Sequence, residues 1–181
     1  MNIIDKIKYR LGYIMLNKEL ENLKRDKVLS NLKTAKKIGI LYYLESEKQY
    51  NVISDFVKSL QEEHKTVKAL GMIPEKTVPH YCFPKIFYDY ITVKDLNWYY
   101  KPNAICVRDF INTEYDILID LTTENSFTIE YISALSKAKL KVGKADNLRK
   151  KYYDIMIDIE KNKDLKYLIL QITHYLSMLK K

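Results

Sequence analysis

Polar stretches that could bind a ligand follow two apolar runs of the chain, 38–44 and 115–121. The residues concerned are Glu45, Ser46, Thr122, Thr123, Glu124 and Asn125. If the two runs are neighbouring strands of a parallel sheet, these side chains meet at its carboxyl edge, where such sheets bind ligands. The second stretch also precedes a predicted helix, whose free N–H groups could hold an anion. An alternative remains open, in which Asn125 or Ser126 only caps that helix.

Other kinds of chemical site find little support in the sequence. The four glycines are scattered, so neither Gly-rich phosphate loop occurs. The spacing of the histidines and of the cysteines fits no metal site; these residues are His64, His80, His174, Cys82 and Cys106. Four aspartates are expected at strand ends in water, namely Asp116, Asp120, Asp154 and Asp158. We assign no catalytic residue, no metal and no cofactor, and this favours a non-enzymatic protein.

Positive charge is concentrated near the start of the chain. The whole sequence has a net charge of +8, and residues 1–37 hold ten Lys or Arg against four acids. Such a segment favours an anionic partner, for example RNA or a ribonucleoprotein. The candidate contact residues are Lys6, Lys8, Arg10, Lys18, Lys24, Arg25 and Lys27. Only four of the 31 basic residues are Arg, the side chain that proteins prefer for binding phosphate groups. A role of the positive charge in solubility alone therefore remains an alternative.

Helical periodicity begins at the amino terminus. Ile3, Ile7, Leu11 and Ile14 are spaced as one stripe, and the pattern predicts one long or two short helices over 2–33. The stripe favours packing against the rest of the protein or against another subunit, as in a homo-oligomer. A helix lying in the plane of a membrane surface is a further alternative, because it needs such a stripe with basic flanks.

The rest of the sequence alternates between predicted strands and helices. Strands are predicted at 38–44, 66–73, 87–93, 115–121, 139–142 and 153–158, and helices at 50–63, 104–112, 127–138 and 164–180. This alternation predicts an α/β fold: a three-layer, Rossmann-like, mostly parallel sheet of about six strands, preceded by a basic amphipathic helix. We expect residues 1–35 to form a basic helical arm and residues 36–181 to form the α/β domain. We also expect the strand around Ile117–Ile119 to lie in the middle of the sheet.

Targeting signals are not recognisable in the sequence. No run approaches eighteen apolar residues, so no membrane-spanning helix is expected. The amino terminus lacks the apolar core of a secretory signal, and the two cysteines do not suggest a disulfide framework. We therefore expect a cytoplasmic protein.

One stretch resembles a known enzyme family. Tyr115–Gly143 runs Y-D-x-x-I-D-L, a polar turn, a helix with small residues, and then A-K-L-K-V-G. This order is similar to the amino-terminal Rossmann-like domain of heptosyltransferase-type glycosyltransferases. The resemblance implies a nucleotide-sugar site, but in that family the donor lies mainly on a second domain. The sequence therefore implies at most a partial or degenerate site, and no catalytic residue is carried over.

The whole chain resembles a family of short uncharacterised proteins from Bacteroidota. The resemblance rests on the basic helical start and on I-G-I-L (38–41), K-D-L-N-W (94–98), F-I-N-T-E-Y-D-I-L-I-D-L-T-T-E-N-S-F (110–127) and S-K-A-K-L-K-V-G (136–143). It implies no activity. Three hypotheses remain: a binding protein for an anionic partner, a glycosyltransferase-like small-molecule site, and an oligomerisation or partner subunit.

Overall fold

The computed structural model describes residues 3–83, 85–147 and 149–179. Its elements in chain order are α1 (Ile3–Leu20), β1 (Lys37–Tyr43), α2 (Glu47–Glu62), β2 (Thr66–Ile73), β3 (Tyr88–Thr92), the 3₁₀ turn Val93–Asp95, α3 (Ile105–Asn112), β4 (Ile117–Asp120), α4 (Phe127–Leu135), β5 (Leu140–Lys144), β6 (Ile155–Ile157) and α5 (Leu165–Met178). Each predicted strand and helix of 38–180 is present, with bounds shifted by a few residues; Lys180 lies outside the described residues.

The six strands form one parallel sheet in the order β3-β2-β1-β4-β5-β6. This is the doubly wound order, so the predicted α/β class is confirmed. β4 lies between β1 and β5: Ile117 is paired with Ile38 on one side and with Leu140 on the other. The central position predicted for β4 is therefore confirmed as well.

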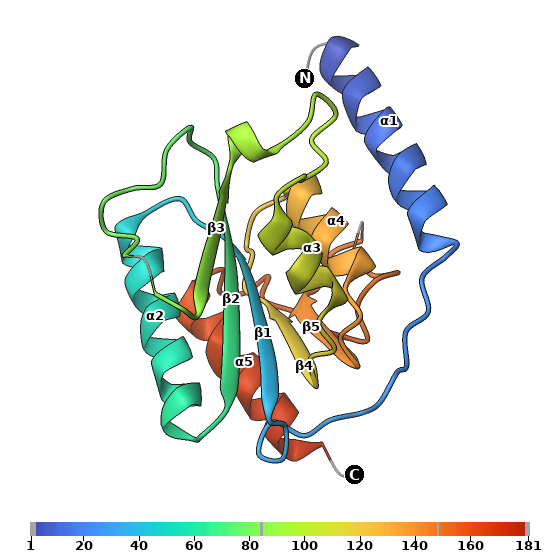
Figure 1. Ribbon diagram of the computed structural model, residues 1–181. Helices are drawn as coiled ribbons and strands as arrows, with labels where there is room; N and C mark the ends of the chain where they lie inside the picture. Colours follow the sequence, from blue (N-terminus) through green and yellow to red (C-terminus); the bar gives the residue numbers. More distant parts are fainter. Residues whose placement is uncertain (1–2, 84, 148, 180–181) are drawn as a thin grey trace.

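Apolar side chains cover both faces of the sheet, as a buried parallel sheet requires. Because successive strand residues point to opposite faces, Ile38 and Ile40 belong to the core beneath α2 and α5, whereas Leu41 belongs to the core beneath α3 and α4. Figure 1 shows the resulting three layers, with α2 and α5 on one side of the sheet and α3 and α4 on the other.

Two of the crossovers between strands are loops. No helix occurs in the described residues of 74–87, between β2 and β3, or of 145–154, between β5 and β6. The second loop instead carries Arg149 and Tyr153, which are buried and both bond to Asp120 at the end of β4. Polar contacts rather than a helix therefore cover this end of the sheet.

Helix α1 ends earlier than predicted. The pattern predicts one long or two short helices over 2–33, but there is one helix in the described residues of this range; it stops at Leu20, and residues 21–36 run along the body to the start of β1 (Figure 1). Backbone bonds to distant segments replace the helical ones: Val28 N donates to Lys139 O and Leu32 N to Leu176 O, over 3.2 and 3.1 Å. Tertiary hydrogen bonds thus override the local helical pattern.

The isoleucine stripe of α1 does not pack against the rest of the protein. Leu16 is fully buried against α4, and Tyr9 and Tyr13 contact the ring of Phe127. Gly12 permits this approach, because a Cβ there would lie 2.7 Å from the Phe127 ring. The packing face is therefore aromatic, and the expectation that the isoleucines pack on the body is wrong.

No helix in the described part of the chain has the length and the apolar character needed to cross a membrane.

Candidate functional site

The carboxyl edge of the sheet has a crevice between β1 and β4. The chain leaves β1 into α2 and continues to β2, whereas it leaves β4 into α4 and continues to β5 on the other side. The two connections diverge, and a doubly wound sheet binds ligands at such a point. The predicted site residues after β1 and β4 therefore lie at the same edge of the sheet.

A pocket of about 420 Å³ opens at this edge. The starts of two helices and the exit of β4 form its walls. The lining residues are Ser46, Lys48, Gln49 and Val52 of α2 and its cap, Thr123 after β4, and Lys163, Asp164, Leu165 and Lys166 at the start of α5. The wall thus combines three lysines with two helix amino termini, each of which carries partial positive charge.

The residues after β1 mainly shape the start of α2. Ser46 is the N-cap, and its Oγ accepts a hydrogen bond from Gln49 N over 3.3 Å. The Gln49 side chain accepts a bond from Glu45 N over 2.9 Å. Ser46 lines the pocket, but exposed Glu45 is not among the lining residues.

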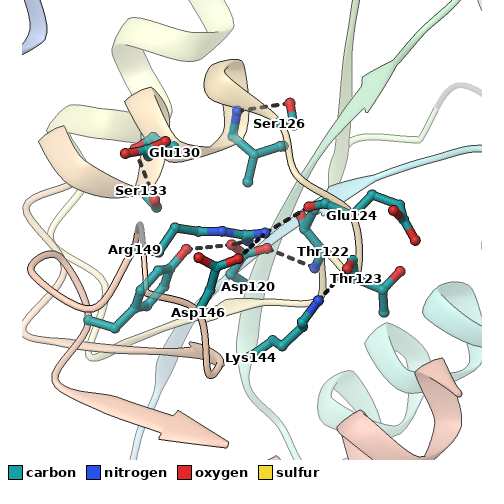
Figure 2. Close-up of polar contacts among 12 residues, drawn as sticks. Asp120, Thr122, Thr123, Glu124, Ser126, Glu130, Ser133, Lys144, Asp146 and Arg149 are labelled. Atoms are coloured by element: carbon teal, nitrogen blue, oxygen red, sulfur yellow. Dashed lines mark hydrogen bonds and ion pairs between the residues drawn. The ribbon is translucent and has the colours of Figure 1, made fainter. Parts of the chain in front are cut away.

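The residues after β4 divide between the pocket and its support. Thr123 lines the pocket, and its carbonyl accepts a bond of 2.7 Å from Lys144 Nζ. Thr122 is fully buried; its N–H donates to Asp120 Oδ1 over 2.8 Å, and its hydroxyl has no hydrogen-bond partner among the described residues. Glu124 is exposed, and its backbone carbonyl accepts a hydrogen bond from Arg149 (Figure 2).

A second pocket, of about 380 Å³, adjoins the first. Asn125 lines it together with Lys144, and Lys163 lines both pockets. Ser126 rather than Asn125 caps α4, since its Oγ accepts a bond from Ile129 N over 3.4 Å. The alternative that Asn125 or Ser126 caps this helix is thus confirmed for Ser126. Asn125 is not the capping residue.

The aspartate at the end of β4 is held in a buried polar cluster. Asp120 and the Arg149 side chain are 0% and 2% exposed. Asp120 Oδ2 accepts from Arg149 Nη1 over 3.1 Å and from the Tyr153 hydroxyl, while Arg149 Nη2 reaches Glu124 O over 2.7 Å (Figure 2). The expectation that Asp120 lies in water is wrong, because the loop before β6 folds over it.

The electrostatics of this cluster are those of a structural anchor. Burial works against the charge of Arg149, but Asp120, Tyr153 and Asp146 together outweigh burial, and the pKa of the guanidinium is raised. Burial and then the Asp120 charge raise the pKa of the Tyr153 hydroxyl well above its ordinary value. Since both oxygens of Asp120 already accept bonds, this carboxylate is not available to a ligand.

The basic residues predicted to contact nucleic acid have different environments. Lys6, Arg10, Lys18, Lys24 and Lys27 are exposed. Lys8 is half-buried, with Nζ 5.6 Å from the centroid of the Tyr100 ring.

Arg25 differs from the other basic residues because its side chain is only 8% exposed. It donates from Nε to Ala138 O over 2.5 Å and pairs with Asp154, to which Lys27 Nζ also lies 3.3 Å away. Arg25 therefore fastens the segment after α1 to β5 and β6.

The lysines of the pocket wall are not among the candidate ligand-binding residues predicted from the sequence. Lys48 lies in the first turn of α2, and Lys163 and Lys166 flank Asp164, the N-cap of α5. Basic residues around the start of the helix after β6 were the available signal, but only the fold brings α5 to the crevice. The described residues contain no group of three or more His, Cys, Asp or Glu that could hold a metal ion.

Comparison with known proteins assigns the family. No curated protein and no solved structure matches the chain. The model of a family of unknown function, DUF6913, matches residues 8–179, which is nearly the whole sequence and includes both the crevice and most of α1. The chain therefore belongs to the DUF6913 family.

Proposed function

We propose that the chain binds a small anionic molecule in the pocket between the ends of β1 and β4. The observation that carries this proposal is the wall of the pocket, where Lys48, Lys163 and Lys166 surround two helix amino termini at the point where the sheet connections diverge. Phosphate-bearing molecules are the class that such walls favour.

The charge of the wall supports an anion. Asp164 is the one acid among the residues that line the pocket, and its Oδ1 already accepts a bond of 2.7 Å from Lys166 N. The ammonium groups of the three lysines make no hydrogen bond or ion pair within the described part of the chain. A bound phosphate would gain several charge-assisted bonds without displacing an internal ion pair.

The size of the pocket supports a nucleotide or a nucleotide sugar better than a macromolecule. A volume of about 420 Å³ is within the range of small-molecule sites. The lining residues include no His or Cys, the Ser46 hydroxyl caps α2, and the one acid, Asp164, caps α5. Binding is therefore proposed and no reaction.

A ligand screen by thermal unfolding tests this proposal. Inorganic phosphate, nucleotides and nucleotide sugars at millimolar concentration are expected to raise the melting temperature, since a ligand at 100 times its Kd stabilises by about 2.7 kcal/mol. The double variant Lys163→Gln with Lys166→Gln should lose this shift, whereas Lys76→Gln on an exposed loop should keep it. If none of these anions shifts the wild-type protein, the proposal is wrong.

A second candidate function is attachment to an anionic partner through α1. The observation that favours it is the orientation of the helix, which exposes Lys6, Arg10 and Lys18. RNA or a ribonucleoprotein is one such partner, but four exposed isoleucines share this face and offer no aromatic surface on which bases could stack. A salt-dependent loss of binding to an anionic probe is the expected mark of this function.

A further inference from the structure

Helix α1 has two chemically different faces. The inner face packs on α4 and the loop before α3, and it carries both acids of the helix, Asp5 and Glu19. The Tyr100 hydroxyl donates to Asp5 over 3.0 Å, and Glu19 accepts from the Tyr131 hydroxyl and from Lys101 Nζ over 2.5 and 2.6 Å. The acids are thus turned toward the protein, away from any surface that approaches α1 from outside.

The outer face of α1 combines aliphatic and basic side chains. Its four isoleucines are 76, 63, 52 and 53% exposed; they are Ile3, Ile4, Ile7 and Ile14. Three exposed cations accompany them, Lys6, Arg10 and Lys18, and their side chains bond to none of the described residues. We call these seven residues the outer face of α1.

The position of the helix leaves this face accessible to a flat partner. Figure 1 shows α1 at the border of the molecule, outside α4 and away from α2 and α5. Its 18 residues span about 27 Å at 1.5 Å per residue. The packing face of the helix stays bound to the body, so the outer face can meet a surface without unfolding anything.

The charge of the outer face decides between the partners that would cover it. A second copy of the chain would bring two sets of three cations together, with no acid on either outer face to balance them. RNA would satisfy the cations but would leave the isoleucines unpartnered. An anionic lipid surface satisfies both, because its headgroups attract Lys and Arg while aliphatic side chains enter the boundary with the acyl chains.

We propose that the outer face of α1 lies in the plane of an anionic membrane surface and holds the protein there reversibly. The inference rests on the second candidate function, an anionic partner of α1, and names that partner as a lipid surface. The four isoleucines would enter the interface, and Lys6 and Arg10 would contact phosphate groups of the lipids. The crevice would remain open to its ligand, because it lies between α2 and α5 rather than along α1.

Vesicle flotation of the full chain tests the inference. We expect the protein to float with vesicles of phosphatidylcholine containing 30% phosphatidylglycerol, and to stay behind with phosphatidylcholine alone. Ile7→Gln combined with Ile14→Gln should weaken binding at least tenfold, and the fold should survive because both side chains are exposed. Ile105→Gln, at an isoleucine that is 68% exposed on α3, is the matched control and should bind as the wild type does.

The charge arm of the experiment uses Lys6→Gln with Arg10→Gln. Each cation near an anionic surface contributes about 1 kcal/mol, which corresponds to about fivefold in affinity, so the pair should weaken binding about 25-fold. Lys76→Gln is the matched control, and raised salt should reduce binding of the wild type.

Four results would overturn the inference. The first is equal binding to neutral and anionic vesicles. The second is no binding to vesicles together with salt-dependent binding of a single-stranded RNA that the isoleucine variant retains; the second candidate function would then stand with RNA as its partner. The third is a concentration-dependent dimer in solution that the isoleucine variant abolishes. Failure to bind either vesicles or RNA would remove the candidate function and the inference together.

Discussion

Cations in the half of the sheet from β4 to β6 differ from those on the outer face of α1. Arg149, Lys141 and Arg25 are buried beside β4, β5 and β6, and each donates to a backbone carbonyl. Lys6 and Lys18 on α1 are exposed and their side chains bond to none of the described residues. The same residue types are therefore structural in one region and available to a partner in the other. The net charge of the chain does not distinguish structural cations from cations that are available to a partner.

The largest expected effect is the removal of Arg149. Arg149→Met leaves the carboxylate of Asp120 buried without its cation, and breaking a buried pair in this way costs about 3–5 kcal/mol of the free energy of unfolding. Urea denaturation at pH 7 measures the loss. Lys150→Met, at the exposed neighbour, should change stability by less than about 0.5 kcal/mol.

A second substitution checks that the charge of Asp120 causes the loss. Adding Asp120→Asn to Arg149→Met removes the uncompensated carboxylate, so part of the stability should return. If Arg149→Met and its exposed control were equally stable, the assignment of Arg149 as a structural cation would be incorrect.

Arg25 provides an intermediate test at the border between the two regions. Arg25→Met removes the ion pair to Asp154 and the bonds to two carbonyls, and should cost about 2 kcal/mol at pH 7. Lys24→Met, at its exposed neighbour, should be close to neutral. An equal effect of the two substitutions would place Arg25 among the available cations.

The loss at Arg25 should depend on pH. Burial alone would raise the pKa of Asp154, but the hydrogen bond from Arg25, a bond from Lys141 N and the charge of Arg25 hold it below its ordinary value. A carboxylate whose pKa is lowered by folding stabilises the protein above its unfolded pKa, and this contribution is lost as the pH falls. The difference between wild type and Arg25→Met should therefore shrink below about pH 4.

Lys141 predicts a second rise of stability with pH, in a higher pH range and for a different reason, because here folding disfavours the charged form of the group. Burial, with the nearby charge of Arg25, lowers the pKa of Lys141 to about 7. Between pH 7 and the ordinary lysine pKa of about 10.4, the unfolded chain keeps a proton that the folded protein has lost, so stability rises with pH. The slope for one proton is at most about 1.4 kcal/mol per pH unit.

Denaturation of the wild type and of Lys141→Met between pH 6.5 and 8.5 measures this slope. The variant should lack the rise, and subtracting its curve removes contributions shared with other groups. Parallel curves would mean that Lys141 keeps an ordinary proton affinity despite its burial.

The smallest effect on stability is expected on α1. Lys6→Gln and Lys18→Gln remove exposed cations without partners in the described structure, so the free energy of unfolding should change by less than about 0.5 kcal/mol. Urea denaturation measures this, and losses above about 1 kcal/mol would remove the contrast between the two regions.

Local pattern was a good guide to the sheet and a poor guide to the candidate site. The apolar runs around Ile38–Leu41 and Ile117–Ile119 predict strands because such runs are buried on both faces of a parallel sheet. Ser46 and Thr123 were placed at the crevice because strand ends of a parallel sheet share an edge. Lys163 and Lys166 were missed, since nothing local shows that the start of α5 lies beside the start of α2.

Helix α1 shows the same limit. The 3.6-residue period predicts a helix from Ile3 onward, but the helix has a second apolar stripe, Tyr9, Tyr13 and Leu16, and the sequence does not say which stripe meets the protein. The choice depends on Gly12 and Phe127, which fit together only in the folded chain.

The order of apolar runs, helix starts and breaks determined by itself that this chain forms a parallel α/β sheet, because burial of alternating side chains depends on neighbours only a few residues away. The tertiary structure alone decided which cations and which isoleucines remain exposed. Whether a charge can be buried depends on partners far along the chain, as with Asp120 and Arg149. Such partners cannot be identified from the local sequence pattern.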